Sequence, residues 1–190
     1  MNACGSGVRI AATHVCAINN NPPAPHSETL IDLAQADGWT VNVVATPAGL
    51  TFIDEQAITQ RTGSPVRSSY APVGRTRTRS SDADALIIAP ATYNTINKLT
   101  QGINDTYALN VAAEAIGRKT PTAILPFVNT ALAARRPFRQ AVEALRSEDV
   151  TVLLGPGQWK PHPPGTGDQQ AHEFPWQTAL LAVTRNPGRA

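Results

Sequence analysis

The chain has 190 residues, the usual length of one folded domain. Hydrophobic residues make up 42% of it and charged residues 16%, which excludes disordered, collagen-like and disulfide-dense chains. The formal net charge of +2 is too small for the many phosphate contacts that strong nucleic-acid binding needs. We therefore expect a globular protein without a nucleic-acid partner.

Cysteine and histidine usage points to the cytoplasm and away from a metal site. Cys4 and Cys16 are the only cysteines, and no apolar run is long enough to cross a bilayer. The start of the chain lacks the basic and apolar regions of a signal peptide, so we expect a cytoplasmic protein that does not associate with membranes. The four histidines, at positions 14, 26, 162 and 172, are scattered and suggest no metal cage.

Short β-branched and apolar runs alternate with longer segments of helical period, which is typical of βαβ units around a parallel sheet. The predicted strands span residues 8–16, 40–46, 85–89, 122–126 and 150–154. The predicted fold is therefore α/β: a single Rossmann-like three-layer α/β/α domain with a mainly parallel sheet. We assign residues 1–190 to this one domain and residues 155–190 to a Pro/Gly-rich C-terminal lid or tail.

Start and stop signals for helices lie between the predicted strands. Ser27 is expected to cap a helix whose end is marked by Gly38. Thr46 followed by Pro47 resembles an N-cap with proline in the first helical position.

The second half of the chain carries two further predicted helices. Asp105 is expected to cap a helix over residues 106–116, with Gly117 as its stop, and another helix is predicted over residues 131–145.

Three turns follow predicted strands at the edge where open parallel sheets bind ligands and helix N-termini present N–H groups to anions. The first contains Cys16, Ala17, Asn19 and Asn20 and supplies amide donors for a phosphate. An ordinary turn rich in Asn and Pro is the alternative.

The second turn begins at Thr46 and includes Ala48, a small residue that permits close approach of a ligand; simple helix capping is the alternative.

The third turn is the most informative. The apolar strand from residue 85 runs into Pro90 and then into a polar face, which is expensive to bury unless it meets a polar ligand or a partner chain. The members of that face are Thr92, Asn94, Thr95 and Lys98.

Residues 89–98, followed by Gly102, Ile103 and Asp105, resemble the flavin-binding signature of the homo-oligomeric flavin-containing cysteine decarboxylases. That family includes phosphopantothenoylcysteine decarboxylase and the peptidyl-cysteine decarboxylases of lantibiotic biosynthesis. The resemblance covers most of residues 8–154, and the tail looks like that of an actinobacterial subgroup of flavoproteins. It implies FMN rather than FAD as cofactor, bound between the subunits of a homo-oligomer built from trimers.

The resemblance also implies roles for individual residues. Asn94 would touch the isoalloxazine ring, and Asn129, in a segment similar to the family's substrate clamp, would face the substrate. The cofactor-binding residues that it implies are Cys16, Ala17, Asn19, Asn20, Thr46, Ala48, Ala89, Pro90, Ala91, Thr92, Asn94, Thr95 and Lys98.

The chain departs from the family at the residue that takes up a proton. Decarboxylating members have a histidine shortly before the third strand, whereas this chain has none between His26 and His162. Residues 76–79 stand there instead, and the guanidinium of Arg79 cannot accept a proton near neutral pH. In the clamp, Val128 and Leu132 replace two methionines and Ala133 replaces a tryptophan.

The resemblance therefore implies an FMN-binding flavoprotein, a flavin-dependent enzyme acting on a small molecule or a modified peptide. An oxidative decarboxylase of the cysteine type with a non-histidine base is one alternative, and a non-catalytic flavin-binding partner subunit is another. No catalytic residue is assigned.

Several residues keep two interpretations. In one interpretation His162 is a general acid or closes over the flavin; in the other it is a solvated loop residue. Cys16 is either a redox thiol or a packing residue. Arg75, Arg77 and Arg79 either bind an acidic group or lie on a solvated loop.

Two segments, residues 65–81 and 155–175, are predicted to be long loops or lids because neither can bury a continuous apolar face. In the tail, Trp159 and Trp176 stack on the flavin or a neighbouring subunit in one interpretation and cover the hydrophobic core in the other.

Overall fold

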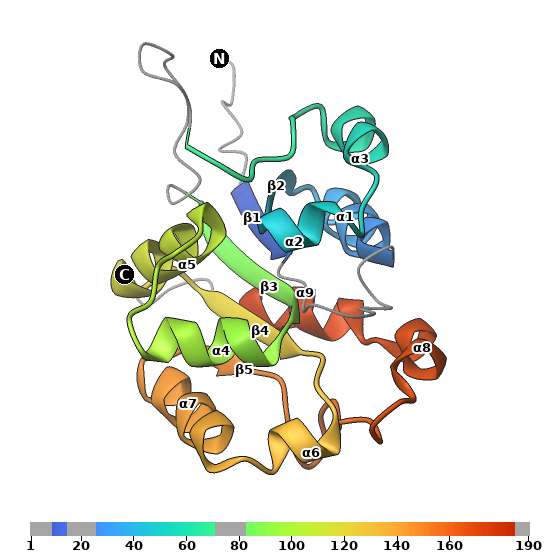
Figure 1. The fold of residues 1–190 in the computed structure, drawn as a ribbon. Coiled ribbons are helices and arrows are strands. Elements are labelled where there is room, and N and C mark those ends of the chain that lie inside the picture. Colours follow the sequence, from blue (N-terminus) through green and yellow to red (C-terminus); the bar gives the residue numbers. More distant parts are fainter. Residues whose placement is uncertain (1–8, 15–25, 71–82, 185–190) are drawn as a thin grey trace.

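Five parallel strands form the centre of the computed structural model, which describes residues 9–14, 26–70 and 83–184 (Figure 1). The order across the sheet is β2-β1-β3-β4-β5, and every neighbouring pair is parallel. The strands are β1 (Arg9–His14), β2 (Thr40–Ala45), β3 (Ala85–Ala91), β4 (Thr122–Pro126) and β5 (Thr151–Val152). The predicted α/β fold with a parallel sheet is confirmed.

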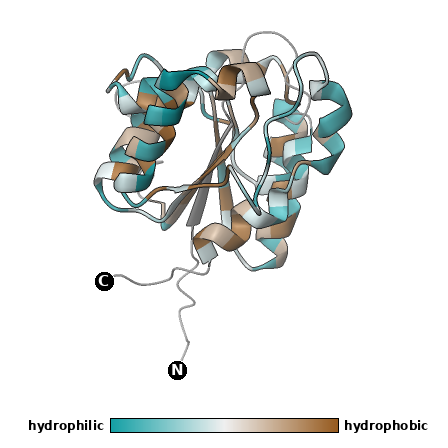
Figure 2. Cartoon of the chain, turned by 90° about the horizontal axis from the view of Figure 1, so that it is seen from below, coloured by the Kyte–Doolittle hydropathy of each residue, from teal (hydrophilic) through white to brown (hydrophobic). Residues whose placement is uncertain are grey.

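Helices cover both faces of this sheet (Figure 2). One layer contains α1, α3 and α9, and the other contains α4, α5 and α7. The helices are α1 (Ser27–Ala36), α2 (Pro47–Leu50), α3 (Glu55–Thr62), α4 (Tyr93–Thr100), α5 (Tyr107–Gly117), α6 (Thr130–Ala133), α7 (Arg136–Ser147), α8 (Gly167–Gln170), the 3₁₀ turn η3 (Ala171–Glu173) and α9 (Trp176–Thr184). None of the helices in the described residues has the length and apolar character needed to cross a bilayer.

Strand β3 lies in the middle of the sheet and is buried along its whole length. Its side chains alternate between the two layers, as the period of two requires: Ile87 packs with α1 and α9, whereas Ile88 packs with α4 and α7. The register against β4 shifts between Ile88 and Ala91, so that Ala91 faces the same layer as Ile88. This irregularity lies where β3 meets α4.

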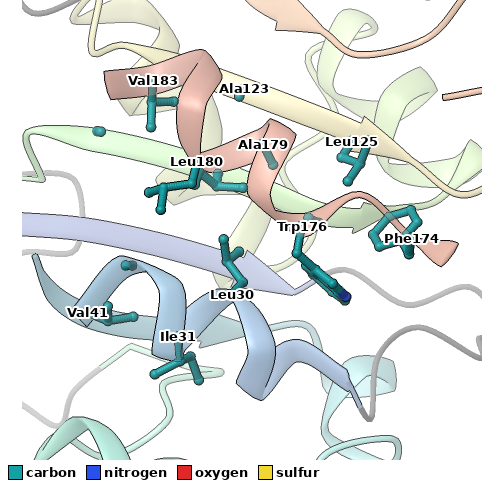
Figure 3. Close-up of a cluster of buried hydrophobic side chains, with 14 of the residues drawn as sticks. Leu30, Ile31, Val41, Ala123, Leu125, Phe174, Trp176, Ala179, Leu180 and Val183 are labelled. Atoms are coloured by element: carbon teal, nitrogen blue, oxygen red, sulfur yellow. The ribbon is translucent and has the colours of Figure 1, made fainter. Parts of the chain in front are cut away.

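The C-terminal helix α9 belongs to the core. Trp176, Ala179, Leu180 and Val183 recur at helical spacing, and each is at most 5% exposed. Figure 3 shows this stripe over the sheet beside Leu30 of α1. The described part of the predicted tail thus packs against the sheet, and Trp176 covers the core. The division into one domain with a C-terminal lid or tail stays a prediction.

Helix starts differ in two places from those predicted. His26, not Ser27, occupies the N-cap of α1, and no side-chain cap bond forms there. Thr106 caps α5 by accepting the N–H of Leu109 at 3.3 Å, whereas Asp105 lies one residue earlier and forms an ion pair with Lys98.

Helix ends and interruptions also differ from the prediction. Gly117 is the last residue of α5 rather than its stop, and the positive φ of 61° falls on Lys119. The single helix predicted over residues 131–145 is two helices, because α6 ends at Ala133 and α7 starts beside Pro137. Gly38, with a φ of 84°, follows α1 as predicted.

Candidate functional site

The strand order places a topological switch point at the carboxyl ends of β1 and β3. The chain passes from β1 outward to β2 and then crosses back to β3, so connections leave these two neighbours in opposite directions. Ligands of open α/β sheets bind in the crevice at such a point. Figure 1 shows α2, the start of α4 and α6 along this edge of the sheet.

Part of the predicted site lies outside the described residues. This applies to the turn after β1, which contains Cys16, Ala17, Asn19 and Asn20, and to the arginines at positions 75, 77 and 79. Their assignments stay predictions.

The turn between β3 and α4 is organised by two threonines. Thr92 is the N-cap of α4, and its Oγ1 accepts the N–H of Thr95 at 3.2 Å. The two hydroxyl oxygens lie 3.1 Å apart and form a hydrogen bond. Both side chains are at most 2% exposed, so the polar groups that seemed costly to bury satisfy one another. These hydrogen bonds hold the turn, and contact of the two residues with a cofactor stays a prediction.

The groups left open at this turn belong to the first residues of α4. Asn94 is exposed, and its side chain has no hydrogen-bond partner among the described residues. The backbone N–H groups of Tyr93 and Asn94 likewise have no acceptor within that part of the chain, as expected for the first turn of a helix. This end of α4 therefore offers N–H donors and one amide side chain.

The small residues before α4 form the floor of the turn. Ala89 and Ala91 are at most 1% exposed and pack into opposite layers, and the peptide bond between Ala89 and Pro90 is cis. Lys98 lies in the last turn of α4, where its Nζ is 2.5 Å from Oδ2 of Asp105. The lysine ammonium is thus paired about 7 Å along the helix from the open end.

The turn between β2 and α2 repeats the same design. Thr46 is the N-cap of α2, its Oγ1 accepts the N–H of Gly49 at 3.0 Å, and Pro47 occupies the first turn as predicted. Thr46 is 6% exposed, and Ala48 is half-buried. The predicted capping is confirmed, while contact with a cofactor stays a prediction.

Asn129 lies at the third turn, between β4 and α6. Its Oδ1 accepts the N–H of Leu132 at 2.9 Å, which leaves Nδ2 without a partner among the described residues. The segment before it adjoins the β3–α4 turn, because the N–H of Phe127 donates to the carbonyl of Ala91 at 2.8 Å. The sequence-predicted residues of β3, α4 and the clamp segment therefore lie together.

A loop far away in the sequence completes this edge. His162 forms a parallel bridge with Asn129: its N–H donates to the carbonyl of Val128 at 3.3 Å, and its carbonyl accepts the N–H of Thr130 at 2.8 Å. Its ring lies 4.7 Å from the ring of Phe127, and the residue is only 9% exposed. The solvated-loop interpretation of His162 is wrong.

An aromatic cluster fixes this loop. The ring centroid of Trp159 lies 6.3 Å from that of Phe127 and 5.4 Å from that of Phe174, and Phe174 also contacts Trp176 at 4.8 Å. Both tryptophans pack with the core of the α1 and α9 layer. The segment predicted as a long loop or lid, residues 155–175, is therefore held by rings that contact one another.

Two further histidines, His26 and His172, contact each other. His26 precedes α1, and its ring centroid is 5.0 Å from that of His172. Within the described residues, no three metal-ligating side chains come close enough together to hold a metal ion.

Comparisons with known proteins agree with this architecture. The chain is similar in structure to the FMN-dependent cysteine decarboxylase TvaF of thioviridamide biosynthesis, with a TM-score of 0.69, 19% identity and coverage of 93% of this chain and 98% of that one. The FMN-dependent cysteine decarboxylase SpaF gives 0.65 and 21%, with 93% and 97% covered. The epidermin biosynthesis protein EpiD from Staphylococcus aureus gives 0.60 and 22%, with 76% and 81% covered. No curated protein matches the sequence.

These similarities confirm the fold that the sequence resemblance implied. A family model described as Flavoprotein matches residues 26–174, from the start of α1 through the aromatic loop. The matched region includes the turns after β2, β3 and β4, which begin at Thr46, Thr92 and Asn129. Since it spans most of the 190 residues, the chain belongs to the Flavoprotein family.

Proposed function

We propose that this protein binds FMN at the carboxyl edge of β1 and β3 and is a flavin-dependent enzyme acting on a small molecule or a modified peptide. The observation that carries the proposal is the β3–α4 turn, where small residues meet the open N-terminus of α4 at the switch point of the sheet. Membership of the Flavoprotein family supports it.

The residues at this edge fit the parts of FMN. Isoalloxazine is a flat ring with hydrogen-bonding groups along its rim. The short side chains of Ala89 and Ala91 are buried in the core and would let a ligand lie close to the backbone at the end of β3, and Asn94 supplies an unpaired amide at the start of α4. Thr46 and Ala48 would lie along the ribityl chain, and the predicted turn at Asn19 and Asn20 would hold the phosphate.

When bound, FMN supplies the electron chemistry, and the protein orients the substrate and excludes water. Asn129 is the substrate-side residue in this proposal: Oδ1 is fixed by the cap of α6, and Nδ2 is free to donate to an acceptor on the substrate. We further propose a thiol, as in a cysteine residue, as the reacting group. The structurally similar TvaF and SpaF are FMN-dependent cysteine decarboxylases, which supports this choice.

The decisive experiment is the purification of the protein with its cofactor. We expect yellow protein whose spectrum is that of oxidised flavin and whose released cofactor has the mass of FMN. Asn94→Trp should abolish flavin retention because the indole would fill the open end of α4. Gln101→Trp, at the exposed opposite end of that helix, is the matched control and should retain FMN. Colourless protein that takes up neither FMN nor FAD would refute the proposal.

Two further features stay predictions. The flavin is expected between subunits of a homo-oligomer, which the mass of the FMN-loaded protein in light scattering tests. A cytoplasmic location follows from the sequence argument alone, and fractionation of the native cells tests it.

A further inference from the structure

His162 is fixed in place by both its backbone and its ring. Its backbone pairs with both neighbours of Asn129, and its ring packs on Phe127. Phe127 in turn is hydrogen-bonded through its N–H to Ala91, the last residue of β3. The imidazole therefore packs on a residue whose backbone is bonded to the turn that we assign to the isoalloxazine. The backbone of His162 is paired beside the residue that we assign to the substrate.

The two ring nitrogens of His162 have different environments. Nδ1 lies 2.9 Å from the carbonyl oxygen of Pro163. A carbonyl can only accept a hydrogen bond, so Nδ1 carries the proton, and Nε2 of the neutral ring is left with a lone pair. Among the described residues Nε2 has no hydrogen-bond partner. This is the tautomer that a proton acceptor needs.

We propose that His162 is a catalytic residue whose Nε2 takes the proton of the substrate thiol. The inference rests on the proposed function, since it needs a substrate beside Asn129 and a flavin beside α4. In this step the S–H bond breaks, a new N–H bond forms at Nε2, and sulfur keeps the electron pair as a thiolate. Nδ1 keeps its own proton, so the ring becomes an imidazolium whose charge strengthens the hydrogen bond to Pro163.

The position of His162 explains how the chain manages without a histidine before β3. The base reaches the site from the loop after β5, anchored on the turn after β4, rather than from the segment before β3. The tether through Nδ1 fixes the direction of Nε2, which a solvated loop histidine would not do.

The test uses the FMN-loaded protein and N-acetylcysteine as the thiol probe. A thiolate lying against an oxidised flavin gives a long-wavelength charge-transfer absorbance, which reports deprotonation without turnover. An ordinary thiol has a pKa of about 8.5, so only about 3% is ionised in solution near pH 7. We expect the band in the wild-type protein near pH 7 because His162 removes the proton.

His162→Asn is the informative variant, since its amide can still donate to the Pro163 carbonyl but offers no basic nitrogen. It should retain FMN, lose the band about tenfold or more near pH 7, and regain it near pH 9.5, where solution supplies the thiolate. His172→Asn changes an exposed histidine in the same way and should behave as wild type.

Three outcomes would overturn the inference. They are a wild-type protein that holds FMN but gives no band, a His162→Asn band of wild-type strength near pH 7, and a band that stays absent near pH 9.5. Should His162→Asn lose FMN, His162→Gln is the second variant, and loss of FMN from both would make His162 a cofactor-holding residue instead. Failure of the wild-type protein to bind FMN would refute the proposed function itself, which keeps the two failures distinct.

Discussion

Leu180→Ala tests whether the C-terminal helix α9 is part of the hydrophobic core or a lid. The sequence allows residues 155–190 to be a lid over a ligand, whereas in the structure α9 packs directly on the sheet. Leu180 is 2% exposed and lies in the same cluster as Leu30 of α1 and Ile87 of β3. A lid could lose this side chain with little effect on folding, but a core helix could not.

The magnitude follows from the buried side chain. Replacing leucine by alanine removes three carbons, worth about 2.4 kcal/mol at roughly 0.8 kcal/mol for each buried methylene. The cavity left between α9 and the sheet raises the loss of unfolding free energy to about 3 to 4 kcal/mol. With a urea m-value of about 2 to 3 kcal/mol/M, the midpoint should fall by roughly 1 to 2 M.

Urea unfolding followed by circular dichroism measures this change, at one fixed FMN concentration because a bound ligand adds its own stability. Leu181→Ala is the matched control: it makes the same substitution one residue further along α9, where the side chain is only half-buried. It should cost about 1 kcal/mol. If Leu180→Ala lowered the midpoint no more than Leu181→Ala, α9 would not be a core helix.

Two smaller changes test the site scaffold and the surface. Thr92→Val removes the acceptor for the Thr95 N–H and the partner of its hydroxyl, so it should lower the unfolding free energy by about 1 to 2 kcal/mol and weaken FMN binding, while Thr92→Ser should keep both; urea unfolding and FMN titration check this. A hydrogen bond with Asp32 raises the pKa of Arg61 above its ordinary value, so the guanidinium stays charged and this contribution is lost only in strong alkali, outside the physiological range. Asp32→Asn should therefore leave the thermal midpoint unchanged across the physiological pH range, because the pair is solvent-screened and Glu28 still faces the guanidinium at 2.6 Å.

The strands were predictable because their signal is local. A buried parallel strand is a short apolar run, and residues 85–91 have no competing interpretation as a helix. Strand β3 extends two residues beyond its predicted end because Ala91 pairs with Pro126 after the register shift. That pairing depends on β4, which a pattern in one segment cannot reveal.

Helix starts were less predictable because adjacent residues are equally good caps. Asp105 and Thr106 both suit an N-cap, and local preference does not choose between them. In the structure Thr106 caps α5, and Asp105 instead pairs with Lys98, seven residues earlier, a contact that the local sequence does not reveal. The same limit applies to α9: its apolar spacing is visible in the sequence, but the Gly/Pro-rich stretch before it favoured a tail.

The sequence located site residues where a turn follows a strand. It left His162 with two interpretations, because 33 positions separate it from Asn129 and no local pattern shows that the two residues pair. The structure shows a property that Asn129 and His162 share: each side chain is held through one polar atom and leaves another without a partner among the described residues. Asn129 is held through Oδ1 and His162 through Nδ1, which leaves Nδ2 and Nε2 open. Groups anchored in this way lose little conformational freedom when a ligand binds, because folding has already ordered them. The two free nitrogens lie on segments that are paired with each other, so a single ligand at this edge would meet both donors or acceptors already in place.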